Sequence, residues 1–320
     1  MELPTLTIGA RTARLPIIQG GMAVRISLGP LATAVADAGG IGLIAGSGLS
    51  PAELAEEVRR TRAATSGVIG VNIMVAVRIF KDLVHAALAE GVDLVVAGAG
   101  FSRDVFTWCR EAGVEFVPIV GSARVARLAE KFGASAVVVE GCDAGGHLGT
   151  DRHLFDLLPE ILDAVDIPVI AAGGLATGAD IKRALDAGAA GVQMGSVFAA
   201  TVESSAPDAF KQMYVEATAD DIIVTKSPVG LPGRAIISPL TKRIARADYP
   251  PIERCRACLK QCGKEYCIID ALEIAQRGDV ERGLIFAGTS AAHVHDIPTA
   301  AELISRLCAE WRTASEGDQS

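Results

Sequence analysis

Eight short apolar runs recur within residues 15–196, and their regular spacing limits the fold more than any other feature of the chain. Each run is continuously apolar rather than alternating, which is typical of strands buried on both faces of a parallel sheet. Amphipathic segments separate the runs, and Ser50, Pro51 and Glu53 give one of them a helix-start signal. The runs lie at residues 15–20, 40–46, 67–75, 92–100, 115–122, 134–141, 167–174 and 190–196.

This number of strand–helix units predicts an α/β fold, and in particular a closed (β/α)8 TIM barrel over residues 1–201. An open, doubly wound sheet is the alternative, although it usually has fewer strands and places its phosphate-binding glycines after the first strand. The rhythm of the pattern breaks after residue 201. We interpret residues 202–312 as a cap over the barrel mouth that carries a cysteine-rich segment and the closing barrel helix. We interpret residues 313–320 as a disordered tail.

Charge and hydropathy narrow the classes of partner. The formal net charge is -8 and no long basic run is present, which argues against nucleic acid or an anionic membrane as a partner. No apolar run reaches the ~18 residues of a membrane-spanning helix, and the first residues lack the pattern of a signal peptide. We therefore expect a cytoplasmic protein that acts on a small molecule. The composition leaves homo-oligomerisation open.

Glycine turns follow the last two predicted strands. In barrels of this kind the active site forms at the carboxyl ends of the strands. Strand seven ends in Gly173 and Gly174, and strand eight ends in residues 193–196, "QMGS". Such turns expose backbone N–H groups, and a nearby helix start adds a favourable field for an anion. The two turns together predict a phosphate cradle, whereas a glycine pair taken alone is common in ordinary turns.

Five segments resemble one family of flavoproteins. "LPIIQGGMA", "GVNIMV", "VVVEGCDAGGHLG", residues 167–198 and "GLIFAG" are similar to the nitronate monooxygenases (2-nitropropane dioxygenase-like) and the FMN-dependent type II enoyl-ACP reductases, over residues 15 to about 307. The resemblance implies FMN at the top of a TIM barrel, with NAD(P)H as an electron donor. It implies that the isoalloxazine ring and its edges meet Gly21, Met22, Asn72, Glu140, Gly145 and Gly146, and that the phosphate meets Gly173, Gly174, Gln193, Met194, Gly195 and Ser196.

One histidine lies in a glycine-rich segment, "EGCDAGGHLGT", after the sixth predicted strand. The resemblance implies that His147 is the catalytic acid/base, a role that suits an imidazole because its unperturbed pKa of ~6.5 is close to working pH. The glycines beside it would let the backbone lie against a flat ring. The alternative is a hydrogen-bonded loop histidine without a catalytic role. We interpret His153 as an ordinary surface residue.

Cys142 lies in the same segment and raises another possibility. Inosine monophosphate dehydrogenase is similar in its barrel, its "IPVIAAGG" turn and a catalytic cysteine on the loop after strand six. A nucleophilic Cys142 would make this chain a purine enzyme, whereas a small buried thiol is the commoner role for such a residue.

Four of the seven cysteines fall within 13 residues, in "CRACLKQCGKEYC". Four thiolates this close can surround one metal centre, either a [4Fe–4S] cluster or a tetrahedral zinc ion. Unligated thiols are the third reading, although exposed free cysteines oxidise readily. Many members of the similar family lack this segment, so the chain falls in a subgroup with a four-cysteine motif. The four residues are Cys255, Cys258, Cys262 and Cys267.

Two reactions remain open at this point. The first is reduction, or the reverse oxidation, of a C=C bond next to the carbonyl of an acyl-CoA or acyl-ACP thioester. Glu140 favours it, because the similar enoyl reductases carry Glu where nitronate monooxygenases tend to carry Gln. The second is oxidation of an alkyl nitronate with O2. A third possibility is a protein without catalytic activity, in which zinc bound to the four cysteines stabilises the barrel as a scaffold.

The loop "KSPVGLPGRAI" is expected to overhang the mouth of the barrel. Its Arg234 either contacts an anionic group of a ligand or is exposed to solvent.

Overall fold

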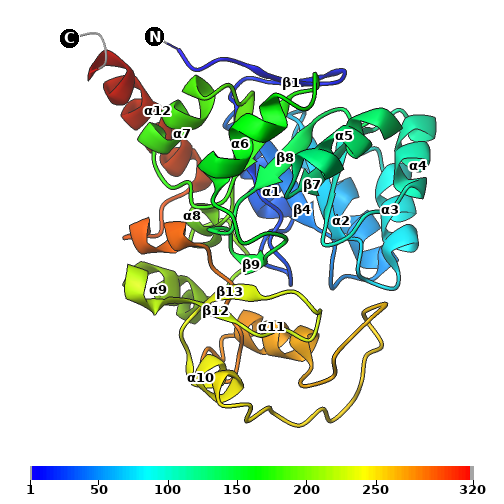
Figure 1. Ribbon diagram of the computed structural model, residues 1–320, viewed down its shortest axis with the longest axis vertical. Helices are drawn as coiled ribbons and strands as arrows, with labels where there is room; N and C mark the ends of the chain where they lie inside the picture. Colours follow the sequence, from blue (N-terminus) through cyan, green and yellow to red (C-terminus); the bar gives the residue numbers. More distant parts are fainter. Residues whose placement is uncertain (1, 318–320) are drawn as a thin grey trace.

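The computed structural model describes residues 2–317, and its centre is a closed barrel of eight parallel strands (Figure 1). Each of the eight apolar runs contains one barrel strand, so the predicted barrel is confirmed and the open-sheet alternative is wrong. The strands are β3 (Ile17–Gln19), β4 (Ile41–Ala45), β5 (Ile69–Met74), β6 (Leu94–Gly98), β7 (Glu115–Val120), β8 (Val137–Glu140), β10 (Val169–Ala172) and β11 (Gly191–Met194).

Helices surround the barrel between successive strands. The predicted start of the helix α2 (Pro51–Ala64) is confirmed: the Ser50 side chain accepts a hydrogen bond from the Glu53 backbone N–H, and the Glu53 carboxylate accepts one from the Ser50 backbone N–H. The closing helix packs against α7 and α1. The outer helices are α1 (Gly29–Asp37), α2 (Pro51–Ala64), α3 (Phe80–Ala89), α4 (Asp104–Ala112), α5 (Ala123–Phe132), α6 (Leu154–Leu162), α7 (Gly178–Asp186) and α12 (Ala300–Gly317).

Two apolar layers explain why the strands read as continuous apolar runs. Residues such as Ile18, Leu43 and Val138 fill the inside of the barrel. Their neighbours along the chain, such as Ile44 and Val139, belong to a second and larger core between the strands and the helices. Because both faces of each strand are buried, no alternating pattern appears in the sequence.

A short hairpin closes the amino-terminal end of the barrel. Its strands are β1 (Leu6–Ile8) and β2 (Arg11–Ala13), which pair antiparallel. Leu6, Ile8 and Ala13 are buried and join the apolar cluster inside the barrel. In Figure 1 this hairpin lies at the end of the molecule opposite to the cap segment.

The segment after residue 201 lies over the carboxyl ends of the barrel strands (Figure 1). One of its strands, β13 (Gly233–Ile236), pairs antiparallel with β9 (Gly146–His147) in the connection between β8 and α6, so the segment is hydrogen-bonded to the barrel. The short helix α8 (Ser196–Ala199) precedes the segment. The elements of the segment before α12 are α9 (Asp208–Glu216), η1 (Ala219–Asp221), β12 (Ile222–Thr225), β13, α10 (Pro239–Ala245), α11 (Ile268–Gln276) and η2 (Thr289–His293).

Helix α12 extends further than expected. It runs to Gly317, so the expectation that the tail is disordered from residue 313 is wrong for residues 313–317; residues 318–320 lie outside the described residues. The continuation has a physical reason, because Trp311 and Ser315 are buried one turn apart and keep the helix against the body of the protein. Among the described residues, no helix combines the length and the apolarity that a membrane crossing requires.

The contact between α7 and α12 gives a test of the packing. A methyl group on Gly178 would lie 2.2 Å from the Trp311 backbone N and 2.3 Å from the Leu307 backbone O. Because backbone cannot yield without moving α12, we expect Gly178→Ala to lower the free energy of unfolding by about 1–3 kcal/mol in urea denaturation. The control Gly149→Ala should cost less, because its methyl group meets no atom of the described residues within 4 Å. Equal losses in both variants would contradict this packing.

Candidate active site

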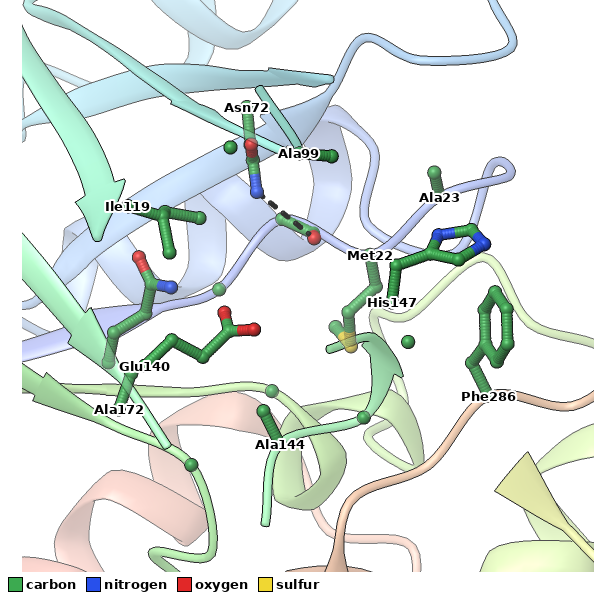
Figure 2. Close-up of a pocket in the computed structure, with 18 of the residues that line it drawn as sticks. Met22, Ala23, Asn72, Ala99, Ile119, Glu140, Ala144, His147, Ala172 and Phe286 are labelled. Carbon is green, nitrogen blue, oxygen red and sulfur yellow. Dashed lines mark hydrogen bonds between the residues drawn. The ribbon is translucent and has the colours of Figure 1, made fainter. Parts of the chain in front are cut away.

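A cavity of about 570 Å³ opens at the carboxyl ends of the barrel strands. Its volume falls within the range of small-molecule and cofactor sites. Figure 2 shows Glu140 on one side of the Met22 side chain and the His147–Phe286 pair on the other. Every residue predicted for catalysis or for FMN lines this one cavity: Gly21, Met22, Asn72, Glu140, Gly145, Gly146, His147, Gly173, Gly174, Gln193, Met194, Gly195 and Ser196.

Gly21 and Asn72 form a close contact at the ends of β3 and β5. The Asn72 side-chain amide donates a hydrogen bond to the Gly21 carbonyl, 3.3 Å away, drawn as the dashed line in Figure 2. A Cβ on Gly21 would lie 2.3 Å from the Asn72 Cβ, so only glycine fits here. The polar side chain of Asn72 is thereby held at the cavity wall.

The glycine turns after β10 and β11 leave their backbone open to the cavity. Gly173 and Gly174 have φ values of 100° and 78°, in the left-handed region that favours glycine. The nearest atom to a Cβ on Gly195 would be the Met22 Cγ, 4.0 Å away, so space adjoins this turn. Backbone of this kind can surround a phosphate.

The helix start after β10 is already occupied by side chains. The Asp180 carboxylate accepts hydrogen bonds from the backbone N–H groups of Ala176 and Thr177, both 2.9 Å. The Glu310 carboxylate accepts one from Gly178 N–H at 2.8 Å. An anion in the cavity therefore gains little from the start of α7, whereas Gly195 and Ser196 at the start of α8 line the cavity.

Gln193 carries an unsatisfied polar atom. Its side-chain Oε1 is buried and has no hydrogen-bond partner among residues 2–317, although the residue lines the cavity. A buried acceptor without a donor costs about 1–3 kcal/mol, and such groups in native proteins usually mark a missing partner. A ligand with a hydrogen-bond donor would satisfy Gln193. FMN has such donors, and its phosphate suits the glycine turns, so the residues present fit this cofactor.

Glu140 ends β8 and faces the cavity (Figure 2). Burial raises the pKa of its carboxyl group from 4.5 to about 7, because the charged form loses its hydration there. At neutral pH the side chain is thus close to the point where it exchanges a proton.

His147 lies on β9, where pairing with Gly233 of β13 fixes its backbone. Its Nε2 lies 2.8 Å from the Ser227 hydroxyl oxygen, and its ring packs edge-on against Phe286 with centroids 5.0 Å apart. Loss of solvent contact lowers the pKa of His147 from 6.5 to about 4, so the imidazole is neutral at pH 7. A neutral imidazole can accept a proton.

Two of these neighbours, Ser227 and Phe286, were not predicted as site residues. Ser227 lies in the "KSPVGLPGRAI" loop, whose Leu231 lines the cavity, so the expected overhang is confirmed. Two hydrogen bonds from the 255–267 segment hold this loop. The Tyr266 hydroxyl donates to the Lys226 carbonyl at 2.9 Å, and Gly263 N–H donates to the Pro228 carbonyl at 2.7 Å.

Arg234 and Cys142 have structural contacts rather than cavity contacts. The Arg234 Nε–H donates to the Cys142 carbonyl at 3.0 Å, so this arginine braces the loop that carries His147. The Cys142 thiol is buried outside the residues that line the cavity, and burial raises its pKa. The protonated thiol is a poor nucleophile, which removes the support for the inosine monophosphate dehydrogenase reading.

The four-cysteine segment lies beside the mouth rather than in the cavity. The Cys258 carbonyl accepts a hydrogen bond from Arg78 N–H at 2.9 Å, and Lys260 N–H donates to the Ala76 carbonyl at 2.9 Å, which docks the segment on the loop after β5. In the part of the chain that the structure describes, no three of these sulfurs lie within 4.8 Å of one another. A zinc ion with Zn–S bonds of 2.3 Å would need sulfurs about 3.8 Å apart, so a preformed zinc site is absent there.

The chain matches known proteins over nearly its whole length. The family model for nitronate monooxygenase matches residues 5–86 and 74–310. A Mycobacterium tuberculosis protein, (3aS,4S,5R,7aS)-5-hydroxy-7a-methyl-1-oxo-octahydro-1H-indene-4-carboxyl-CoA dehydrogenase, is 36% identical over 72% of the chain. The matched part spans 65% of that relative, slightly less than two thirds of its length.

Two solved structures are similar to this one. FabK from Thermotoga maritima has a TM-score of 0.86 and 33% identity, covering 95% of this chain and 94% of that one. Nitroalkane oxidase from Streptomyces ansochromogenes has a TM-score of 0.81 and 26% identity, covering 95% of this chain and 98% of that one. Together with the family model, these matches show that the chain belongs to the nitronate monooxygenase family.

The pKa of Glu140 predicts a pH dependence of stability. The unfolded carboxyl group ionises near pH 4.5 and the folded one near 7, so the folded state binds more protons between these values. The stability that Glu140 contributes is therefore present below pH 4.5 and is lost as the pH rises to about 7. Glu140→Gln removes the titration, so the variant should gain stability relative to wild type between pH 4.5 and 8. Urea denaturation of the flavin-free proteins measures this, and a difference that stays constant with pH would contradict it.

Proposed function

We propose that this chain is an FMN-dependent oxidoreductase that acts on the C=C bond next to the carbonyl of an acyl thioester, with NAD(P)H as electron donor. The observation that carries the proposal is the cavity, which is lined by a neutral imidazole, by open glycine turns and by the residue with the unsatisfied glutamine oxygen. Bound there, FMN would supply the group that takes up and returns hydride. Gly173, Gly174 and residues 193–196 would hold its phosphate, and Gly21, Met22, Asn72, Glu140, Gly145 and Gly146 would surround its ring.

His147 would move the proton of the reaction. In the oxidative direction its neutral imidazole accepts the proton lost from the carbon next to the carbonyl, and in the reductive direction it returns that proton. Ser227 orients the ring through its contact with Nε2, 2.8 Å away, and Phe286 keeps water from one side of it. Glu140, with its raised pKa, would hold a proton at the opposite end of the cavity.

The names of the relatives support a thioester substrate. The Mycobacterium tuberculosis relative is a dehydrogenase of a carboxyl-CoA compound, and a Rhodococcus jostii protein with the same name is 34% identical. Both names describe a dehydrogenase of a CoA thioester, which is the class of substrate proposed here.

Nitronate oxidation is the second candidate. The family model and the similarity to a nitroalkane oxidase favour it. The same neutral imidazole of His147 could take a proton from a neutral nitroalkane, so the two reactions would share one base. They differ in the compound that exchanges electrons with the cofactor.

Anaerobic stopped-flow mixing separates the two candidates. Reduced enzyme is mixed with crotonyl-CoA or O2, and oxidised enzyme with an alkyl nitronate, while flavin absorbance is followed. We expect crotonyl-CoA to give the fastest change. We expect His147→Ala to retain flavin but to slow that change by about 10²–10⁴, whereas the exposed control His295→Ala should leave it unaltered. A nitronate reaction that outpaces crotonyl-CoA would favour the second candidate, and an unaltered rate in His147→Ala would refute the assigned base.

We also propose that Cys255, Cys258, Cys262 and Cys267 hold a [4Fe–4S] cluster, with zinc as the alternative. A cube of four irons holds its cysteine sulfurs further apart than one zinc ion does. Arg256, within the segment, adds a positive charge near Cys267 although it also pairs with Asp270 and Glu273. Cys258→Ser should lower bound iron by elemental analysis and reduce the broad visible absorption, while the control Cys308→Ser should not. Zinc in place of iron in the wild-type protein would favour the alternative, and unchanged metal content would rule out the site.

A further inference from the structure

Three side chains of different chemistry meet on the loop between β8 and α6, outside the cavity. The Cys142 Sγ lies 3.6 Å from the His153 Nδ1, and this nitrogen lies 2.6 Å from the Asp143 Oδ2. All three atoms lie within 4.8 Å of one another, and among the described residues they form the one group of three or more such ligands. We propose that Cys142, Asp143 and His153 bind a single divalent ion of the zinc class.

The spacing of the atoms suits such an ion. With a Zn–S bond of about 2.3 Å and a Zn–N bond of about 2.0 Å, a tetrahedral site places sulfur and nitrogen about 3.5 Å apart. The Cys142 Sγ and the His153 Nδ1 are 3.6 Å apart, close to this value. The carboxylate and the imidazole are closer, at hydrogen-bond distance, and would have to separate by less than about 1 Å to admit the ion. The His153 side chain is 68% exposed and is free to make this movement.

The ligand set and its surroundings are those of a zinc site. Thiolate, imidazole and carboxylate are the three groups that zinc prefers, and three protein ligands leave a fourth position for water. The thiol is buried, the Asp143 carboxylate is 24% exposed and the imidazole is more exposed still, so the site has a closed wall and an entry path from solvent. A thiol and a carboxylate that were both exposed on the surface would not form a site with a buried side.

Backbone contacts hold the ligands in place before any ion arrives. The Cys142 backbone N–H donates to the Arg152 carbonyl at 2.8 Å, which ties the first ligand to the residue before His153. The Cys142 carbonyl accepts from Arg234, and the Asp143 carbonyl accepts from Thr289 N–H at 3.0 Å. Fixed supporting contacts of this kind raise the affinity of a metal site.

The position of the site suggests what a bound ion would do. Cys142 and Asp143 lie in the chain between Glu140 and His147, and His153 is the residue before α6. An ion would therefore join the loop that carries His147 to the start of α6. Because the ion binds the folded protein, it should also raise the melting temperature. The site is separate from the cavity and from the 255–267 segment, so its test does not depend on the reaction.

Zinc competition measures the site directly. Full-length protein carrying Cys258→Ser, which weakens the other cysteine cluster, is titrated with Zn²⁺ against a chromophoric chelator. We expect one equivalent to bind, with the affinity falling at least about 10–100-fold in Cys142→Ala, His153→Ala and Asp143→Asn. The matched controls are Cys308→Ala, a half-buried thiol, and His295→Ala, an exposed imidazole, which should leave the affinity unchanged. Circular dichroism and flavin content show that each variant is folded.

Cadmium NMR identifies the ligands independently. A ¹¹³Cd resonance in the range of one sulfur with nitrogen and oxygen ligands, lost in Cys142→Ala and His153→Ala, would support the site. If every ¹¹³Cd resonance of the Cys258→Ser background persists unchanged in both variants, the proposed site is overturned. Equal zinc binding by the background protein and by its Cys142→Ala/His153→Ala form would overturn it as well.

Discussion

Pairing of the last barrel strand with the first is the constraint on which the rest of the structure depends. Met194 pairs with Gln19, and the Met194 carbonyl then accepts a hydrogen bond from Gly20 N–H at 2.8 Å. This closure brings the carboxyl ends of all eight strands to one rim. Side chains and turns that lie far apart in the sequence, such as Asn72, Glu140 and Gly195, become the walls of one cavity. Without closure these residues would follow the open edge of a twisted sheet.

The barrel and the residues at the carboxyl ends of its strands could be predicted, because their physical causes produce local patterns in the sequence. Burial on both faces produces continuous apolar runs, and strand ends with glycine, asparagine or glutamate stand out against them. No local pattern in the sequence indicates the residues that contact His147. Its contact with Ser227 spans 80 residues and depends on the register between β9 and β13, which tertiary pairing decides. The occupied start of α7 depends in the same way on Glu310 from α12.

At one position near His147, glycine is required for a reason in addition to the one expected from the sequence. The glycines near His147 were expected to let the backbone lie against a ring. A Cβ on Gly145 would lie 2.6 Å from the Gly288 backbone N, so this glycine is also required by the segment after Phe286. One residue thus serves the packing of the cap and the shape of the cavity, and sequence alone cannot separate the two demands.

Burial drives the Glu140 and His147 side chains of the cavity toward their uncharged forms. The pKa of Glu140 rises to about 7 and that of His147 falls to about 4. The two groups differ in the proton transfer they can perform. The protonated Glu140 carboxyl group can donate a proton, and the neutral His147 imidazole can accept one. A site with little fixed charge binds an uncharged reacting group without a large desolvation cost.

The β1–β2 hairpin has a kinetic consequence. Leu6, Ile8 and Ala13 seal one end of the barrel, so molecules enter and leave at the other end, under the loop that carries Ser227. Under the proposed function, electron donor and electron acceptor would reach the cofactor through the same opening of the barrel. The two half-reactions would then alternate, and an excess of either reactant would obstruct the other.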